Sequence, residues 1–211
     1  MLTIARLFFA ALTLTAIGQQ LILHIGASYS VVNFFSYFTN LSNLLAALVL
    51  LLSVFGASVM SSATRDLLRY ASVVNMTIVG LVFAALLRNV DLGSLLPWVN
   101  FVLHYVMPVV IVLDWLLQPP ASKLQAKHLC IAFVFPALYI AYTLLRGASM
   151  GWYPYPFLNP ANVGGYSGVA LYAVGITVTF LLAAWALLAV GNRLAKAELG
   201  RAKSSNLPIP L

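Results

Sequence analysis

Charged residues are scarce in this sequence, and acidic residues are the scarcest of them. Asp and Glu together number four in 211 residues, against eleven Lys and Arg, and charged residues make up 7% of the chain. A soluble domain of ordinary composition carries about 25% charged residues. Hydrophobic residues instead make up 63%, and the mean hydropathy is +0.99. This composition excludes a water-soluble globular domain and indicates an integral membrane protein.

Cysteine and histidine are also few. The single Cys130 excludes an internal disulfide and a cysteine-based metal cluster. The three histidines are scattered, and no glycine-rich loop of the kind that cradles phosphate is present. No lysine lies within the long apolar runs, which excludes a retinal-type Schiff base. The sequence therefore implies neither a metal site nor an organic cofactor.

What the chain does contain is six apolar runs, each at or near the roughly 20 residues that a membrane-spanning helix needs. The runs are Ile4–Ile25, Phe34–Val59, Leu67–Leu87, Leu95–Leu117, His128–Leu145 and Gly165–Val190. The first run has no small-residue cleavage site, so we interpret it as a retained helix and not as a signal peptide. The predicted fold is all-α: a polytopic membrane protein with a bundle of six transmembrane helices. Residues 1–200 are expected to form its single domain, and residues 201–211 a short disordered cytoplasmic tail.

The basic residues predict the orientation of this bundle. With the N-terminus in the cytoplasm, nine of the eleven Lys and Arg fall on the inner side, and only Arg88 and Arg146 fall outside. The positive-inside rule then places both termini in the cytoplasm, in agreement with an even number of spans. The expected location is the cell membrane, with membrane lipids as partners. A nucleic-acid partner is not expected, because no basic stripe with interleaved aromatic residues exists.

Two of the runs contain polar residues at helical spacing. Thr39, Asn40 and Asn43 form a stripe in the second run, and Asn100 and His104 share a face of the fourth. Hydroxyls and amides commonly bridge helices within membranes, so Thr39 taken alone is typical of a structural role. An imidazole is costly to place in lipid, which makes His104 a candidate functional group.

The expected depths of Thr39 and His104 in the membrane are similar. At 1.5 Å per residue, Thr39 lies about 7 Å and His104 about 13 Å below the outer boundary of the membrane. The difference of roughly 6 Å permits contact between their side chains. A base beside a hydroxyl suggests a nucleophile and its activator. His24 ends the first run on the same outer side and can join them.

Pro108 and Asp114 follow the histidine in the same run. Pro108 has no N–H for the carbonyl of residue 104, so we expect a kink beside the histidine and a free carbonyl there. Asp114 is about 15 Å from His104 along a regular helix and cannot orient its ring. Its expected partners are basic residues near the inner surface: Arg65, Arg69, Lys123 or Lys127.

Several residues are candidates for two supporting roles, which are to orient the histidine ring and to stabilise an oxyanion. An asparagine or a backbone carbonyl can orient His104. Because helix amides are expected to be bonded within their helices, an oxyanion hole requires side-chain donors, and Asn40, Asn43 and Asn100 are the candidates. Arg88, at the outer end of the third run, either extends toward headgroups or receives a substrate carboxylate.

The outer loop at residues 147–164 is rich in aromatic residues and proline. Trp152, Tyr153, Tyr155 and Phe157 suit the headgroup region of a membrane, where amphipathic rings gather. The alternative interpretation is a lid over an outward-facing site.

Three segments resemble one known family. YFTNLSNLL (37–45), NFVLHYVMPVVIVLDWLL (100–117) and GWYPYPFLNP (151–160) are similar, in order and spacing, to segments of the androgen-induced, androgen-dependent TFPI-regulating family of six-span membrane proteins. The resemblance implies the hydrolysis of fatty acid esters of hydroxy fatty acids by a threonine and a histidine within the membrane.

By this resemblance, the catalytic roles carry over to Thr39 and His104. Asn40 and Asn43 depart from the eukaryotic pattern, so the chain resembles a prokaryotic relative. The sequence thus predicts an intramembrane hydrolase of lipid esters that acts through an acyl-threonine intermediate. Two alternatives remain: a non-enzymatic lipid or small-molecule binding protein or transporter with a polar cavity, and a structural membrane subunit.

Overall fold

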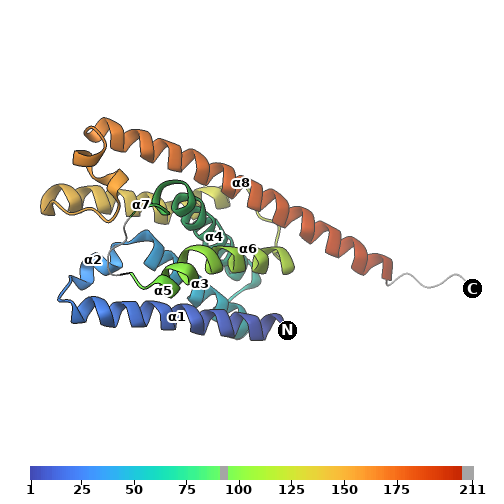
Figure 1. Ribbon diagram of the computed structural model, residues 1–211. Helices are drawn as coiled ribbons and strands as arrows, with labels where there is room; N and C mark the ends of the chain where they lie inside the picture. The colour runs from blue at the N-terminus through green and yellow to red at the C-terminus, as the bar shows by residue number, and fades with distance from the viewer. Residues whose placement is uncertain (91–94, 206–211) are drawn as a thin grey trace, which may run out of the picture.

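The computed structural model describes residues 1–90 and 95–205, and every regular element in that part of the chain is helical (Figure 1). In chain order the elements are α1 (Leu2–Gly26), α2 (Val31–Phe35), α3 (Phe38–Phe55), η1 (Gly56–Ser58), α4 (Ser62–Val82), η2 (Phe83–Leu87), α5 (Pro97–Phe101), η3 (Val102–Val106), α6 (Met107–Leu117), α7 (Lys127–Met150), η4 (Pro156–Leu158), η5 (Pro160–Asn162) and α8 (Tyr166–Ser205).

Within the described residues, six helical segments are long and apolar enough to cross a membrane: α1, α3, α4 with η2, α5 to α6, α7 and α8. This confirms the predicted all-α class and the six spans, and the chain is an integral multi-pass membrane protein. The long helices form a bundle with α1 and α8 on opposite sides, and the N-terminus and the end of α8 lie at the same end of it (Figure 1).

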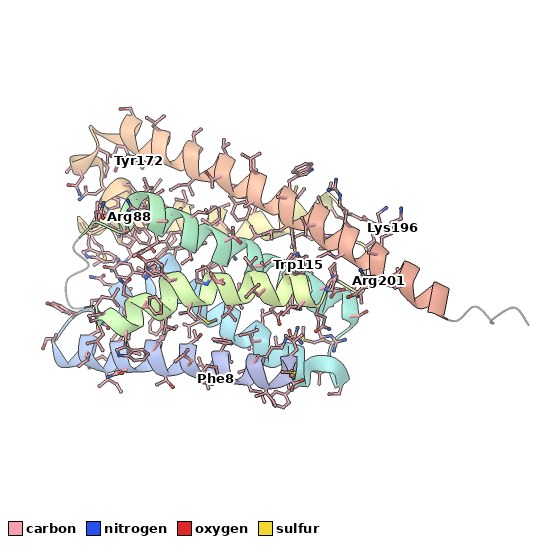
Figure 2. The ribbon with its side chains drawn as sticks, turned by 45° about the vertical axis from the view of Figure 1, so that its right-hand side comes forward. Phe8, Arg88, Trp115, Tyr172, Lys196 and Arg201 are labelled. Atoms are coloured by element: carbon pink, nitrogen blue, oxygen red, sulfur yellow. The ribbon has the colours of Figure 1, made fainter. Side chains whose placement is uncertain are left out.

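Helix α8 extends beyond the rest of the bundle and carries Lys196 and Arg201 on this extension (Figure 2). It continues to Ser205, so the first five residues of the expected tail are helical. The reason is local, because residues 193–203 are mostly Ala, Leu, Lys, Arg and Glu, which favour helix even in water. The rest of the expected tail, residues 206–211, lies outside the described residues.

The second predicted run is broken near its start. The short helix α2 ends at Phe35, and the backbone at Tyr37 is extended, with φ −81° and ψ 124°. Helix α3 then begins at Phe38. Thr39 therefore lies in the first turn of a helix, whereas the sequence had placed it inside a continuous one.

The fourth span contains a π-helical turn, η3, which includes His104. In this turn the N–H of Met107 donates to the carbonyl of Val102, five residues earlier. The carbonyl of Leu103 then faces residue 108, a proline without an N–H. The expected disruption at Pro108 is thus present as a π turn. The carbonyl of Leu103 therefore lacks a backbone donor and accepts a hydrogen bond from a side chain instead. The sequence predicted a free carbonyl at His104, but the π turn shifts the hydrogen-bond register by one residue.

Helix α4 lies at the centre of the packing. Tyr70, Val73, Val74 and Met76 are all fully buried on it. The Tyr70 hydroxyl donates to the carbonyl of Ala184 at 2.8 Å, which ties α4 to α8. A buried tyrosine hydroxyl requires such a partner, and this one holds the central helix against the long C-terminal helix.

A buried charge cluster joins α1, α4 and α6 at the end of the bundle that holds the N-terminus. The Nε of Arg6 donates to Oδ1 of Asp114 at 2.6 Å, and Nη2 of Arg69 donates to Oδ2 at 3.1 Å. All three side chains are at most 10% exposed. Asp114 was expected to pair with one of four basic residues, and Arg69 is the one of these that it contacts. Arg6, which the sequence marked only as a topology signal, is its second partner.

Candidate active site

Thr39 and His104 meet near the end of the bundle opposite the charge cluster. Their Oγ1 and Nε2 atoms are 3.3 Å apart, and both residues are buried. Thr39 comes from the first turn of α3 and His104 from the π turn η3. The contact that their estimated depths permitted is therefore present in the folded chain.

The histidine ring is oriented by the backbone of its own helix. Its Nδ1 lies 3.2 Å from the carbonyl oxygen of Asn100. A carbonyl oxygen only accepts hydrogen bonds, so Nδ1 carries the proton and Nε2 presents a lone pair to the Thr39 hydroxyl. The ring also stacks on Phe83, with centroids 4.1 Å apart and planes 24° apart. His104 is thus held in the tautomer and plane that a base for Thr39 requires.

The backbone amide of Thr39 is not used by its helix. The amide of Asn40 donates to the carbonyl of Tyr37 at 3.1 Å, but the N–H of Thr39 donates to the hydroxyl of Tyr155 at 3.2 Å. The expectation that helix amides near the site are bonded within their helices is wrong here. Helix α3 begins at Phe38, and the first amides of a helix have no carbonyl within it to reach.

Two cavities meet at Thr39. The outer cavity has a volume of about 530 Å³ and a polar lining that includes Gln20, His24, Asn40 and His104. The second has a volume of about 290 Å³ and lies between α3, α4, α7 and α8. Its lining is almost wholly apolar: Phe133, Ala137, Ile140, Ala173, Ile176 and Phe180 are among its residues. Thr39, Leu87 and Tyr155 border both cavities.

The sequence model of the family described as FAR-17a/AIG1-like protein matches residues 2–189. The chain belongs to this family. The match confirms the resemblance of the three segments, since the family is that of androgen-induced gene 1. The match covers the first five membrane-spanning segments and the sixth as far as residue 189. No curated protein and no solved structure matches the chain.

Two of the three asparagines expected near the dyad bind backbone carbonyls through their side chains. The side-chain amide of Asn40 donates to a carbonyl of α2 at 2.8 Å. That of Asn43 donates to the carbonyl of Thr39 at 2.9 Å and to that of Leu103 at 3.2 Å. Asn100 contacts His104 through its backbone carbonyl, which accepts from Nδ1 of the ring. The amide donors of Asn40 and Asn43, proposed for an oxyanion hole, are thus engaged with the backbone.

The outer residues Arg88 and His24 lie apart from the dyad. Arg88 is exposed at the end of the bundle where η2 finishes (Figure 2), and it is not among the described residues that line the two cavities. His24 borders the outer cavity, but its Nε2 lies 2.9 Å from the carbonyl of Ser30. Across residues 1–90 and 95–205, no three His, Cys, Asp or Glu side chains are grouped so as to hold a metal ion.

Tyr155 belongs to the site, although the sequence did not assign it there. Its hydroxyl lies 3.3 Å from Oγ1 of Thr39, although the two residues are 116 positions apart. The available signals were the aromatic outer loop, for which a lid was one interpretation, and the third resembling segment. The structure places this loop over the site, with Phe157 and Leu158 buried against α4 and α8.

Proposed function

We propose that this protein is an intramembrane hydrolase of lipid esters, with Thr39 as the nucleophile and His104 as its base. The observation that carries the proposal is the 3.3 Å contact between Thr39 Oγ1 and the unprotonated Nε2 of His104. A hydroxyl becomes an effective nucleophile when an adjacent base is itself oriented by a third group. The carbonyl of Asn100 supplies that third group.

The two cavities support an ester as the substrate. An ester has an acyl portion and an alcohol portion that diverge from the carbonyl carbon, and Thr39 stands where two cavities diverge. The apolar cavity suits a hydrocarbon acyl chain, and the outer cavity suits the more polar alcohol portion. The family resemblance implies fatty acid esters of hydroxy fatty acids, whose alcohol portion carries a carboxyl group.

The reaction follows from the protonation of His104. As Oγ1 of Thr39 attacks the ester carbonyl carbon, its proton moves to Nε2 of His104. The tetrahedral intermediate collapses with cleavage of the bond to the alcohol oxygen, which takes the proton from Nε2 and leaves as the alcohol. The acyl-threonine is then attacked by a water whose proton moves to the same nitrogen. Return of that proton to Oγ1 releases the carboxylic acid and restores both residues.

The orientation in the membrane is part of the same proposal. The cationic extension of α8 lies at the end of the bundle that holds the N-terminus, so the positive-inside rule directs this end to the cytoplasm of a cell membrane. The dyad then lies in the outer half of the bilayer. Lipid substrate enters from the outer leaflet.

The test is activity-based labelling of the purified full chain in detergent. A fluorophosphonate probe is expected to label the wild type, and Thr39→Ala is expected to abolish both labelling and ester turnover. His104→Ala is expected to lower turnover by about 10²–10⁴-fold, the usual contribution of a general base. Thr179→Ala is the matched control, because Thr179 lies in α8, is not among the described residues that line the two cavities, and donates to the carbonyl of Gly175 at 2.9 Å.

Each outcome separates the enzyme from the alternatives. Full ester turnover by Thr39→Ala removes Thr39 as the nucleophile. If the wild type shows neither labelling nor turnover but binds lipid saturably, the cavities belong to a binding protein or transporter. If it shows none of the three, the polar residues serve only to hold the helices together.

A further inference from the structure

Tyr155 projects from the outer loop into the site. Its hydroxyl accepts from the Thr39 N–H at 3.2 Å and lies 3.3 Å from Thr39 Oγ1. It also borders both cavities. The hydroxyl therefore stands at the junction of the cavities, beside the nucleophile.

The ring of Tyr155 is held on two sides. It stacks on Phe157 with centroids 5.2 Å apart and planes 5° apart, and it meets Tyr37 edge-on at 5.7 Å. These contacts leave the ring little freedom, so the position of its hydroxyl oxygen is set before any ligand enters, and only the O–H bond has to rotate. Preorganised donors of this kind cost little rearrangement during a reaction.

The hydroxyl has a proton to give. A phenol has one donor and accepts through its oxygen, and the Thr39 N–H already occupies an acceptor position. Burial raises the pKa of Tyr155 to about 12, so the phenol stays protonated at neutral pH. Its proton is directed toward Thr39 Oγ1 or toward an acceptor that arrives there.

We propose that Tyr155 is a catalytic residue that donates a hydrogen bond to the carbonyl oxygen of the ester as Thr39 attacks. The proposal rests on the hydrolase function argued above. On binding, the carbonyl oxygen displaces the Tyr155 oxygen as the acceptor for the Thr39 N–H, and the Tyr155 hydroxyl turns to donate to the same oxygen. The negative charge of the tetrahedral intermediate then meets two donors, one from the backbone and one from the loop.

The asparagines explain why the loop supplies this donor. The side-chain amides of Asn40 and Asn43 are engaged with backbone carbonyls, and the ring of His104 serves the nucleophile. Tyr155 is the residue whose side chain contacts both the hydroxyl and the amide of Thr39. Closure of the outer loop over the bundle thus completes the site, and the loop acts as more than an interfacial belt.

The experiment compares an ester with its thiono analogue, in which sulfur replaces the carbonyl oxygen. Sulfur is a weak hydrogen-bond acceptor, so the thiono ester gains little from an oxyanion donor. With 4-nitrophenyl decanoate, Tyr155→Phe is expected to lower kcat by about 10²-fold with KM nearly unchanged. With the thiono ester the loss is expected to be much smaller, so the preference for the oxygen ester falls in the variant.

Two controls distinguish this role from a structural one. Tyr105→Phe removes the hydroxyl of an exposed tyrosine beside His104 and is expected to retain wild-type kinetics. Binding of decyl 4-nitrophenyl ether, which has no carbonyl, is expected to be the same in the wild type and Tyr155→Phe. Equal losses on both esters, or loss of ether binding, would overturn the proposal while leaving the hydrolase function intact. A wild type without turnover on either ester overturns both.

Discussion

The side-chain amide of Asn43 donates to the carbonyl of Leu103, 3.2 Å away and 60 residues further along the chain. This carbonyl lacks a backbone donor because the π turn directs the Met107 N–H to Val102 and because Pro108 has none. The same amide holds the carbonyl of Thr39 at 2.9 Å. One side chain therefore sets the distance between the helix that carries the nucleophile and the turn that carries the base.

Replacing Asn43 is expected to impair both stability and catalysis. Asn43→Ala leaves the buried carbonyl of Leu103 without its donor, at a cost of about 1–2 kcal/mol in the free energy of unfolding, the range for hydrogen bonds between model membrane helices. Loosening of α3 against η3 is expected to lower kcat by between about 10- and 100-fold. Unfolding in detergent and ester turnover measure the two effects.

The matched control for Asn43 is Asn192. Its side chain also makes two hydrogen bonds to backbone, with the N–H and the carbonyl of Leu124, both at 2.9 Å. These bonds join α8 to the loop before α7, away from the dyad. Asn192→Ala is expected to lose stability but to keep kcat. Equal losses of kcat in the two variants would show that Asn43 acts only through general stability.

The charge cluster predicts a large effect of Asp114. Asp114→Asn leaves Arg6 and Arg69 buried without the carboxylate between them, and breaking such a cluster costs about 3–5 kcal/mol. The thermal unfolding midpoint in detergent, followed by circular dichroism, is expected to fall sharply. Glu198→Gln, at an exposed position on the α8 extension, is expected to leave it unchanged. An unchanged midpoint for Asp114→Asn contradicts a stabilising role for the cluster.

The apolar cavity predicts a limit on acyl chain length. Ala173→Phe adds a ring to the cavity wall formed by α8. Long-chain esters are expected to lose about tenfold or more in kcat/KM, while acetate and butyrate esters keep theirs. Turnover of a series of 4-nitrophenyl esters of increasing acyl length measures this. A uniform loss across the series would place the acyl chain elsewhere.

The raised pKa of Tyr155 predicts a pH dependence of stability. Burial raises this pKa from 10.0 to about 12. Between these values the unfolded chain has lost the phenolic proton and the folded chain retains it, so stability falls as pH rises. The free energy of unfolding is expected to decline less steeply in Tyr155→Phe than in the wild type over this range. Parallel curves would show that Tyr155 titrates alike in both states.

Some features of the site were predictable because they depend on position along one helix. The rise per residue placed Thr39 and His104 at neighbouring depths, and the positions of the basic residues limited the expected partners of Asp114 to four, one of which is Arg69. Residues separated by a long stretch of chain were not predictable in this way. Arg6 and Tyr155 meet their partners 108 and 116 positions away, and nothing local marks those pairings.

The sequence alone determines that the protein is a membrane protein, that it has six spans and where its basic residues cluster. The length of an apolar run and the positions of charged residues depend only on the order of residues along the chain. Tertiary structure decided the rest of the site. The extended backbone that starts α3 just before Thr39 is held by the hydroxyl of Tyr139, which donates to the carbonyl of Ser36 at 2.9 Å. The start of α3 at Phe38 leaves the amide of Thr39 to donate to Tyr155. The depth of a residue in the membrane can thus be predicted from the sequence. The rotation of each helix about its axis and the positions of its breaks depend on the elements that pack against it.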